Sequence, residues 1–191
     1  MVVAGSQHLL GHAQGRQLLM SAALHRGFTL VELMVALAIA SILLVLAVPQ
    51  YSTFMGNSEI RSGAESVTAG LRQAQLAAIS ENRNSQFTLG ATGWNVQMVG
   101  PPLTLVQTMS LNEGSKHATF AAVDAAAAAA TTLQFNALGQ VIPNATNIVQ
   151  IDITNALPTA KPLRILVGNG RTGVKLCDPS IIVISDPKHC P

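Results

Sequence analysis

A run of sixteen residues without a charge, residues 33–48, constrains this chain more than any other feature. With residues 28–32 it forms an almost wholly apolar helix candidate roughly 30 Å long at about 1.5 Å per residue, which matches one bilayer core. The single charged residue within 28–48 is Glu32, which follows the pair Gly27–Phe28 closely. Because an unpaired carboxylate in lipid costs several kcal/mol, we expect this glutamate to meet a cation.

The segment before this run is basic. Residues 1–26 contain Arg16, Arg26 and three histidines but no acidic residue. By the positive-inside rule, such a segment stays in the cytoplasm and places the rest of the chain across the membrane. The formal net charge of the whole chain is only +2. Net charge therefore argues neither for nor against nucleic acid as a partner.

The segment after Pro49 predicts the second half of a long helix. Charged and amide side chains now appear, and the apolar ones recur at spacings of three, four and seven, which is typical of an amphipathic helix. The expected buried positions are Ile60, Val67, Leu71, Ala74 and Ala78. We therefore expect one helix, kinked at Pro49, that is apolar all round over residues 28–49 and amphipathic over residues 50–82.

Beyond Asn82 the pattern is that of strands. Short runs rich in β-branched and aromatic residues alternate with Gly, Pro and Asn, and several alternate between apolar and polar residues. The expected strands fall within residues 85–91, 93–100, 103–111, 117–123, 132–142, 147–154, 163–169 and 173–177. The alanine-rich stretch Asp124–Thr132 is expected to be a loop or a short surface helix. The predicted fold is α+β, with a long N-terminal helix packed on an antiparallel β-rich head, residues 83–191.

The sequence Gly27-Phe28-Thr29-Leu30-Val31-Glu32, between a basic leader and an apolar helix, resembles the class III signal of type IV pilins and type II secretion pseudopilins. The resemblance implies that a prepilin peptidase removes residues 1–27, cutting between Gly27 and Phe28, and N-methylates Phe28. It implies that Glu32 pairs with the N-terminal amine of a neighbouring subunit, and that Pro49 is the family's helix-kinking proline. Such pairing offsets the burial cost of both charges.

Three other interpretations of the apolar run stay open at the level of sequence. An ordinary single-pass anchor tolerates a glutamate near its end. A secretory signal is also compatible, because Val45-Leu46-Ala47 fits cleavage after Ala47 and leaves a soluble secreted β domain that starts at Val48. A buried helix of a soluble protein is the third. We also expect translation to start at Met20, because that gives a leader of the usual length for the family.

The rest of the chain resembles the GspH/FimT group of minor pilins and pseudopilins. The segments that carry this resemblance are "LRQAQLAAISENRN", "GWNVQMV", "LQFNALGQV" and "LRILVGNGRTGVKLCDP". It implies a structural subunit of a type IV pilus or a type II secretion pseudopilus, at or near the filament tip and not an enzyme. The implied partners are other pilins or pseudopilins, the prepilin peptidase, an inner-membrane assembly platform, and lipid before assembly. The implied location is the inner membrane with the head in the periplasm, followed by the cell surface or a periplasmic pseudopilus.

Enzyme chemistry has little support in the residues themselves. The part after Gly27 has two histidines, His117 and His189, in no recognised catalytic spacing. Cys177, His189 and Cys190 are metal-binding residue types, but a fourth ligand at usable spacing is missing. A disulfide between Cys177 and Cys190 is the favoured prediction, since a membrane-targeted chain points to an oxidising compartment. We expect no cofactor and no metal.

A basic C-terminal region raises DNA as a further partner. From residue 161 onward the basic residues outnumber the acidic ones, and the candidate phosphate-binding side chains are Lys161, Arg164, Arg171 and Lys175. Some FimT-type minor pilins bind DNA through a Gly-Arg-x-Arg segment, which implies a DNA-binding alternative for natural transformation. Here Gly173 replaces the second arginine. A solvated hairpin with scattered charges is the favoured interpretation.

Overall fold

The computed structural model describes residues 27–157, 159–168 and 173–191. Contacts divide the chain into two units, Met1–Ile42 and Leu43–Pro191. A single helix of the described chain, α1 (Leu30–Ser80), contributes residues to both units. Residues 1–26, and with them the expectation about Met20, lie outside the described residues.

Thr29 caps the start of α1 in the first unit. The Glu32 N–H donates to Thr29 Oγ1 at 3.2 Å, and the Leu33 N–H donates to the Thr29 carbonyl at 3.1 Å. A threonine at this position satisfies amide groups that the first helical turn otherwise leaves unpaired. Every described side chain of this unit is exposed, so no other described residue covers its apolar surface.

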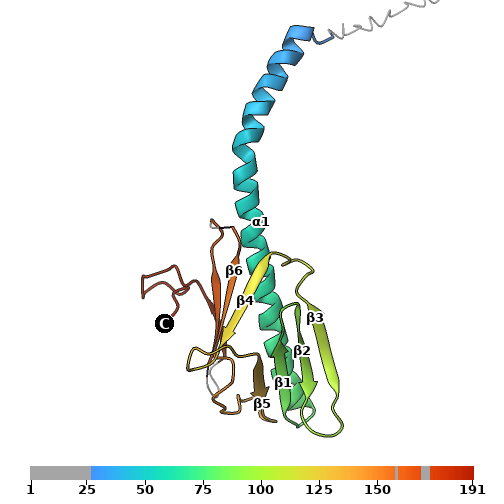
Figure 1. Cartoon of the computed structure of the whole chain (residues 1–191), viewed down its shortest axis with the longest axis vertical. Coiled ribbons are helices and arrows are strands. Elements are labelled where there is room, and N and C mark those ends of the chain that lie inside the picture. The colour runs from blue at the N-terminus through green and yellow to red at the C-terminus, as the bar shows by residue number, and fades with distance from the viewer. Residues whose placement is uncertain (1–26, 158, 169–172) are drawn as a thin grey trace, which may run out of the picture. The chain divides into compact units, whose positions relative to one another are not determined.

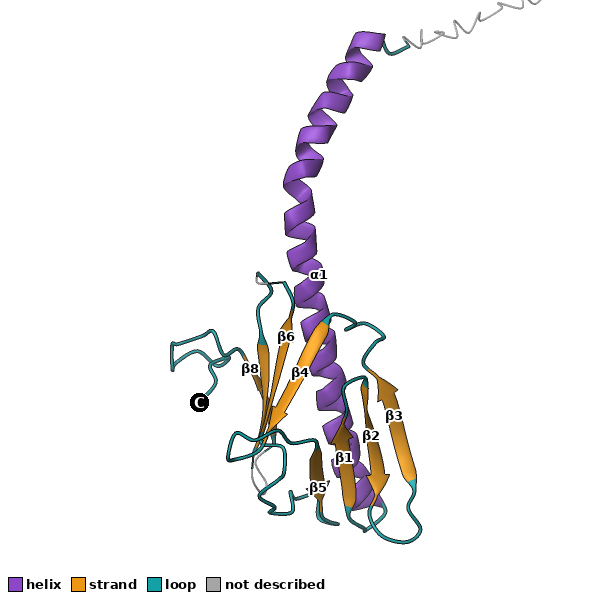
Figure 2. Cartoon of the chain, viewed as in Figure 1, coloured by secondary structure: helices purple, strands orange, loops and turns teal. Residues whose placement is uncertain are grey.

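The second unit contains α1 from residue 43 onward and, among the described residues, eight strands in two antiparallel sheets (Figure 2). The strands are β1 (Ser85–Leu89), β2 (Gly93–Met98), β3 (Leu105–Ser110), β4 (Ala118–Val123), β5 (Thr132–Phe135), β6 (Gln150–Asn155), β7 (Leu163–Val167) and β8 (Val174–Cys177). One sheet has the order β3-β2-β1-β5 and the other β4-β6-β7-β8. Both contribute to one core against α1.

The amphipathic half of α1 packs as its spacing predicts. All five expected positions are fully or almost fully buried: Ile60, Val67, Leu71, Ala74 and Ala78. Three glycines spaced by seven residues, Gly56, Gly63 and Gly70, lie on the same buried face. A Cβ atom on Gly70 would lie 2.8 Å from both Phe87 Cε2 and Trp94 Cδ2. The missing side chain therefore lets the aromatic rings of the first sheet approach the helix backbone.

Alternate residues are buried along β1, β2, β5, β6 and β7, as expected where one face of a sheet packs on a core. Their fully buried side chains include Phe87, Val96, Leu133, Ile151, Ile153 and Ile165. The expected strand over residues 132–142 is shorter than predicted, because the Asn136 side chain accepts from the Leu138 and Gln140 amides and closes a turn. The alanine-rich stretch forms a turn, with Asp124 Oδ1 accepting from the amides of Ala126 and Ala128.

Candidate functional site

The candidate processing site lies at the exposed start of α1. Phe28 is 84 % exposed, and a Cβ atom added to Gly27 would have no described atom within 4 Å beyond its chain neighbours. The fold therefore does not require a glycine at residue 27. The Glu32 carboxylate makes no hydrogen bond or ion pair with any described residue, although the first turn of a helix favours an acidic side chain.

The apolar stretch that follows is long enough to cross a membrane. Within the described residues α1 is the one helix that meets this condition by length and composition, and none of its most apolar 18-residue window is buried. Pro49 lies inside the helix, and its carbonyl accepts from the hydroxyls of Ser52 and Thr53 at 2.8 and 3.2 Å. Because proline has no N–H, Pro49 itself donates no backbone hydrogen bond within the helix.

A polar cluster that the sequence did not reveal fastens α1 to the head. Glu59 Oε1 is 2.9 Å from His117 Nδ1, and Glu59 Oε2 accepts from Asn155 Nδ2 at 3.0 Å. The hydrogen bond from His117 holds the pKa of the Glu59 carboxyl below its ordinary value of 4.5; burial opposes this, and the His117 charge and Asn155 reinforce it. The sequence predicts no such role for His117, because its partner Glu59 lies 58 residues away and no local spacing links the two.

Two further polar contacts continue this attachment towards the membrane-spanning half. The hydroxyls of Thr53 and Thr159 are 2.9 Å apart, and the Lys161 amide donates to Asn57 Oδ1 at 2.7 Å. Lys161 therefore acts in the fold through its backbone, while its side chain lines a hollow beside α1.

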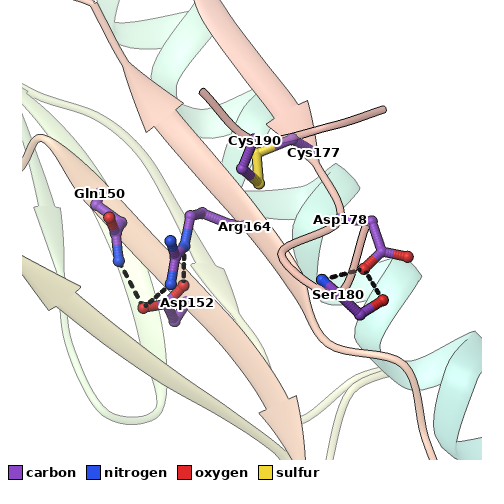
Figure 3. A network of polar contacts seen from close by, with 7 residues as sticks. All are labelled: Gln150, Asp152, Arg164, Cys177, Asp178, Ser180 and Cys190. Atoms are coloured by element: carbon purple, nitrogen blue, oxygen red, sulfur yellow. Dashed lines mark hydrogen bonds and ion pairs between the residues drawn. A yellow bond between two sulfur atoms is a disulfide. The ribbon is translucent and has the colours of Figure 1, made fainter. Parts of the chain in front are cut away.

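Three of the four basic residues predicted to bind DNA lie in the described structure, and two of these three side chains make contacts within the chain. Arg164 Nε donates to Asp152 Oδ1 at 2.6 Å and its Nη2 donates to Oδ2 at 3.3 Å, so the charge of Arg164 is offset (Figure 3). Lys175 Nζ donates to the carbonyl of His189 at 3.1 Å. Arg171 lies outside the described residues. DNA binding therefore stays a prediction without a described contact in its favour.

Cys177 and Cys190 form the predicted disulfide (Figure 3). Their sulfur atoms are therefore not available as metal ligands, and the described residues include no cluster of three or more metal-binding side chains. The third residue of that group, His189, uses Nδ1 to contact the Ile181 carbonyl at 2.6 Å. The cysteines thus close a structural loop, residues 178–189.

Comparison with known proteins connects both halves of the chain to filament subunits. Residues 23–48 match the prokaryotic N-terminal methylation motif, and residues 63–171, more than half of the chain, match the family of the type II transport protein GspH. Curated relatives include the type IV major fimbrial protein FimA of Dichelobacter nodosus, 35 % identical over 74 residues. A fimbrial protein of Pseudomonas aeruginosa is 38 % identical over 76 residues.

These alignments cover 38 % and 35 % of this chain, and 47 % and 49 % of the relatives, so the chain spans about half the length of the curated relatives it matches. Among solved structures, the type IV minor pilin FimU of Pseudomonas aeruginosa strain PAO1 is similar, with a TM-score of 0.48 and 17 % identity. That similarity covers 64 % of this chain and 91 % of the FimU chain.

An exposed apolar helix with an N-terminal methylation motif, continued into a β-rich head, defines the class of type IV pilin-like proteins. Within this class, the chain belongs to the GspH family. It is a structural protein and not an enzyme. Its apolar helix and its methylation motif place it in the inner membrane before it enters a pilus or pseudopilus.

Proposed function

We propose that this chain is a minor subunit of a type IV pilus or a type II secretion pseudopilus, assembled at or near the filament tip. Its partners are then the prepilin peptidase, the inner-membrane assembly platform and neighbouring pilins or pseudopilins. The observation that carries the proposal is the helix start: an open glycine, an exposed Phe28 and a carboxylate with no described partner precede an uncovered apolar helix.

The apolar surface of this helix suits two environments in succession, first the bilayer and then the core of a filament. About 20 apolar residues suffice to cross a bilayer, and the same apolar surface can pack against other helices in a filament core. A cut between Gly27 and Phe28 creates an amine one turn from Glu32. In a filament the carboxylate of one subunit and the amine of another neutralise each other, which lowers the cost of burying both charges.

Mass spectrometry of the mature N-terminus tests the processing step. We expect the full chain, expressed in cells with a prepilin peptidase, to begin at N-methylated Phe28. Because the fold places no constraint on Gly27, a Gly27→Leu variant should remain uncut while its head stays folded. An N-terminus at Val48 would show the secreted-domain interpretation to be right, and an uncut wild-type chain would show an ordinary anchor.

Assembly is tested separately by Glu32→Gln. This variant should still be cut, methylated and retained in the membrane, since the apolar span is unchanged. Its recovery in sheared pili, or in a pseudopilus fraction, should fall at least about tenfold, because the buried amine of a neighbour loses its counter-charge. The matched control is Glu65→Gln, whose carboxylate is exposed and paired with Arg61. Equal incorporation of both variants would contradict the proposed role of Glu32.

A further inference from the structure

The disulfide-closed loop exposes three consecutive large apolar side chains. Ile182, Val183 and Ile184 are 88 %, 62 % and 85 % exposed, and we name residues 182–184 the C-terminal knob. Single exposed apolar residues are common on protein surfaces, whereas consecutive ones are unfavourable unless they have a function. Burial of the knob needs an apolar environment from outside the described chain.

The loop that carries the knob is ordered by its own contacts. The Cys177–Cys190 disulfide closes it, and the Asp178 amide donates to the Lys188 carbonyl at 2.8 Å. The Asp186 carboxylate accepts from the Lys188 amide at 2.8 Å, and the Asp178 carboxylate accepts from the Ser180 amide at 2.9 Å (Figure 3). A surface that is already ordered loses little conformational entropy when it binds. The knob is thus preorganised, and both carboxylates of the loop have partners within it.

Exposed aromatic side chains on α1 indicate the level of the membrane surface. Residues 43–48, the end of the uncharged run, belong to the same unit as the head. Tyr51 and Phe54 follow within two helical turns, and they are 66 % and 67 % exposed. Aromatic residues at the ends of membrane-spanning helices lie among the lipid head groups. With the apolar run in the bilayer core, we therefore expect the head groups near Tyr51 and Phe54.

The C-terminal loop lies close to this level of α1. Asp178 and Lys188, at the two ends of the loop, line a hollow together with Asn57 and Arg61 of the helix. Asn57 and Arg61 follow Phe54 by three and seven residues, which is about 5 and 10 Å along the helix. Figure 1 shows the loop, in dark red, projecting sideways from the head beside α1. Membrane helices tilt by about 20° on average and by up to about 40°, so a tilt of α1 toward the loop brings the knob to the lipid surface.

The free charges beside the knob are positive. Lys161 and Lys188 line the same hollow, and neither ammonium group bonds a described residue. Glu65 in this hollow pairs with Arg61 at 2.9 Å, and the carboxylates of the loop have the partners given above. Segments that lie in a lipid surface combine apolar side chains, which enter the acyl chains, with cations at the phosphates. A phospholipid surface therefore matches both the knob and the charges beside it.

We propose that, before assembly, the C-terminal knob inserts into the membrane surface on the side of the head, while Lys161 and Lys188 contact lipid phosphates. The bilayer is the occupant that the chain itself brings within reach, because α1 anchors the head to it. The inference goes beyond the proposed function, since it needs the membrane location alone and neither processing nor a filament. The head then has a second attachment to the bilayer, which must be released when the subunit enters a filament.

Fluorescence quenching by lipid tests this contact. The full-length chain is reconstituted at one copy per nanodisc, in phosphatidylethanolamine and phosphatidylglycerol whose acyl chains carry bromine near the head groups. An Ile184→Trp variant should lose about half of the emission that the new tryptophan adds, because a side chain inserted roughly 5–10 Å into the surface meets the bromine atoms. The emission of Trp94, which is 3 % exposed, provides the baseline in the wild-type chain. A single copy per disc excludes contact with a second copy.

Leu138→Trp is the matched control. Leu138 is 75 % exposed, and the carbonyl of the adjoining Gly139 accepts from Gln75 at 2.8 Å. Gln75 follows Phe54 by 21 residues, or about 32 Å along α1, so this side chain is far from lipid. The tryptophan introduced there should keep its full emission. Absence of quenching at both positions, or equal quenching at both, overturns the proposal.

Charge reversal tests the contact of the lysines with phosphate. Added to Ile184→Trp, Lys188→Glu should lower the quenched fraction, because a basic residue at an anionic lipid surface favours the contact about fivefold. Arg72→Glu is the matched control, since Arg72 is an exposed cation of α1 that follows Phe54 by 18 residues, or about 27 Å. Equal quenching with the two charge reversals overturns the phosphate contact. All the substituted side chains are exposed, so we expect each variant to fold, and near-ultraviolet circular dichroism checks this.

The nanodiscs contain no prepilin peptidase and no filament machinery, so the quenching result does not depend on the proposed function. A chain that is cut before Phe28 in cells but shows no quenching keeps the proposed function and refutes the membrane contact of the knob. A chain that is not cut in cells but shows quenching at residue 184 alone refutes the proposed processing and keeps the membrane contact.

Discussion

Two glutamates on α1 differ in whether a described residue of the same chain binds their carboxylate. Glu59 is enclosed by His117 and Asn155, its side chain being 17 % exposed, and its charge is used within the chain. Glu32 has no partner among the described residues, and its charge needs a nearby cation if the segment enters an apolar environment. At the residue scale, the first glutamate stabilises the head and the second is available for assembly.

The Glu59 contact predicts a pH-dependent stability. The Glu59 carboxyl has a lower pKa in the folded than in the unfolded chain, so it binds fewer protons when folded. Its contribution to the free energy of unfolding is therefore complete above the unfolded pKa and is lost as pH falls through the folded pKa. Near pH 7, Glu59→Gln should lower the free energy of unfolding by about 1–2 kcal/mol, because it replaces the charged acceptor of the His117 and Asn155 hydrogen bonds by a neutral one. The difference from wild type should disappear in acid.

Denaturant unfolding of the full chain in detergent, followed by the fluorescence of the single Trp94, measures this effect. The control is Glu65→Gln, whose exposed pair with Arg61 should contribute less than about 0.5 kcal/mol. A difference between Glu59→Gln and wild type that stays constant from neutral to acid pH would show that the charge of Glu59 is not the cause.

At the element scale, α1 has an apolar buried face, which its periodicity predicts, and three buried glycines, which its periodicity does not predict. The buried positions from Ile60 to Ala78 could be predicted from spacing alone, because apolar residues that recur every three or four positions lie on one face of a helix. The glycines at residues 56, 63 and 70 carry no hydropathy signal. Their role appears only when Trp94 and Phe87, far along the chain, are placed against them.

Substitution of Gly70 tests this packing. Alanine favours a helix by about 1 kcal/mol over glycine, yet Gly70→Ala should destabilise the head by about 1–3 kcal/mol, because the new methyl group overlaps two aromatic rings. Thermal unfolding monitored by near-ultraviolet circular dichroism reports both the stability and the environment of Trp94. Ser58→Ala, at an exposed position of the same helix, is the control; a Gly70→Ala chain as stable as this control would contradict the close approach.

The disulfide is the second element-scale feature with a measurable effect. It joins residues 13 apart, and on the chain-entropy model such a loop adds about 3 kcal/mol. The double variant Cys177→Ala/Cys190→Ala should lose about this amount, and protease should cut it first within residues 178–189. Reduction of the wild-type chain should give the same cleavage pattern, and an unchanged pattern in both would show that hydrogen bonds alone hold the loop.

On the scale of the whole molecule, sequence predicted the class of fold and the main elements, but not the contacts made across them. All eight expected strands are present in the described chain, since alternation and turn residues are local signals. The order of strands in the two sheets, the Glu59–His117 pair and the apposition of Arg164 and Asp152 join residues distant in sequence. The Gly27–Glu32 motif is visible in the sequence because its residues are contiguous, and its cleavage and its role in assembly remain predictions.

The DNA-binding alternative is also a question about the whole molecule, because the chain after the leader is neutral overall. If duplex DNA is bound through the C-terminal region, reversal of charge at Arg171 and Lys175 should weaken binding in a gel-shift titration, most strongly at low salt. Reversal of Arg164 serves as the comparison, since Asp152 already offsets its charge. Equal affinity of the wild-type chain and the Arg171/Lys175 variant would remove this region as a DNA site.

The threonine cap at the start of α1 has an electrostatic consequence for a processed subunit. Only Phe28 and Thr29 would precede the helix after a cut at Gly27. A helix start carries about half a unit of positive charge, so the new ammonium group would face a like charge from its own backbone. An isolated subunit would then be electrostatically frustrated at this end. Contact with the Glu32 carboxylate of another subunit relieves that frustration, and this would favour the assembled state over the free one.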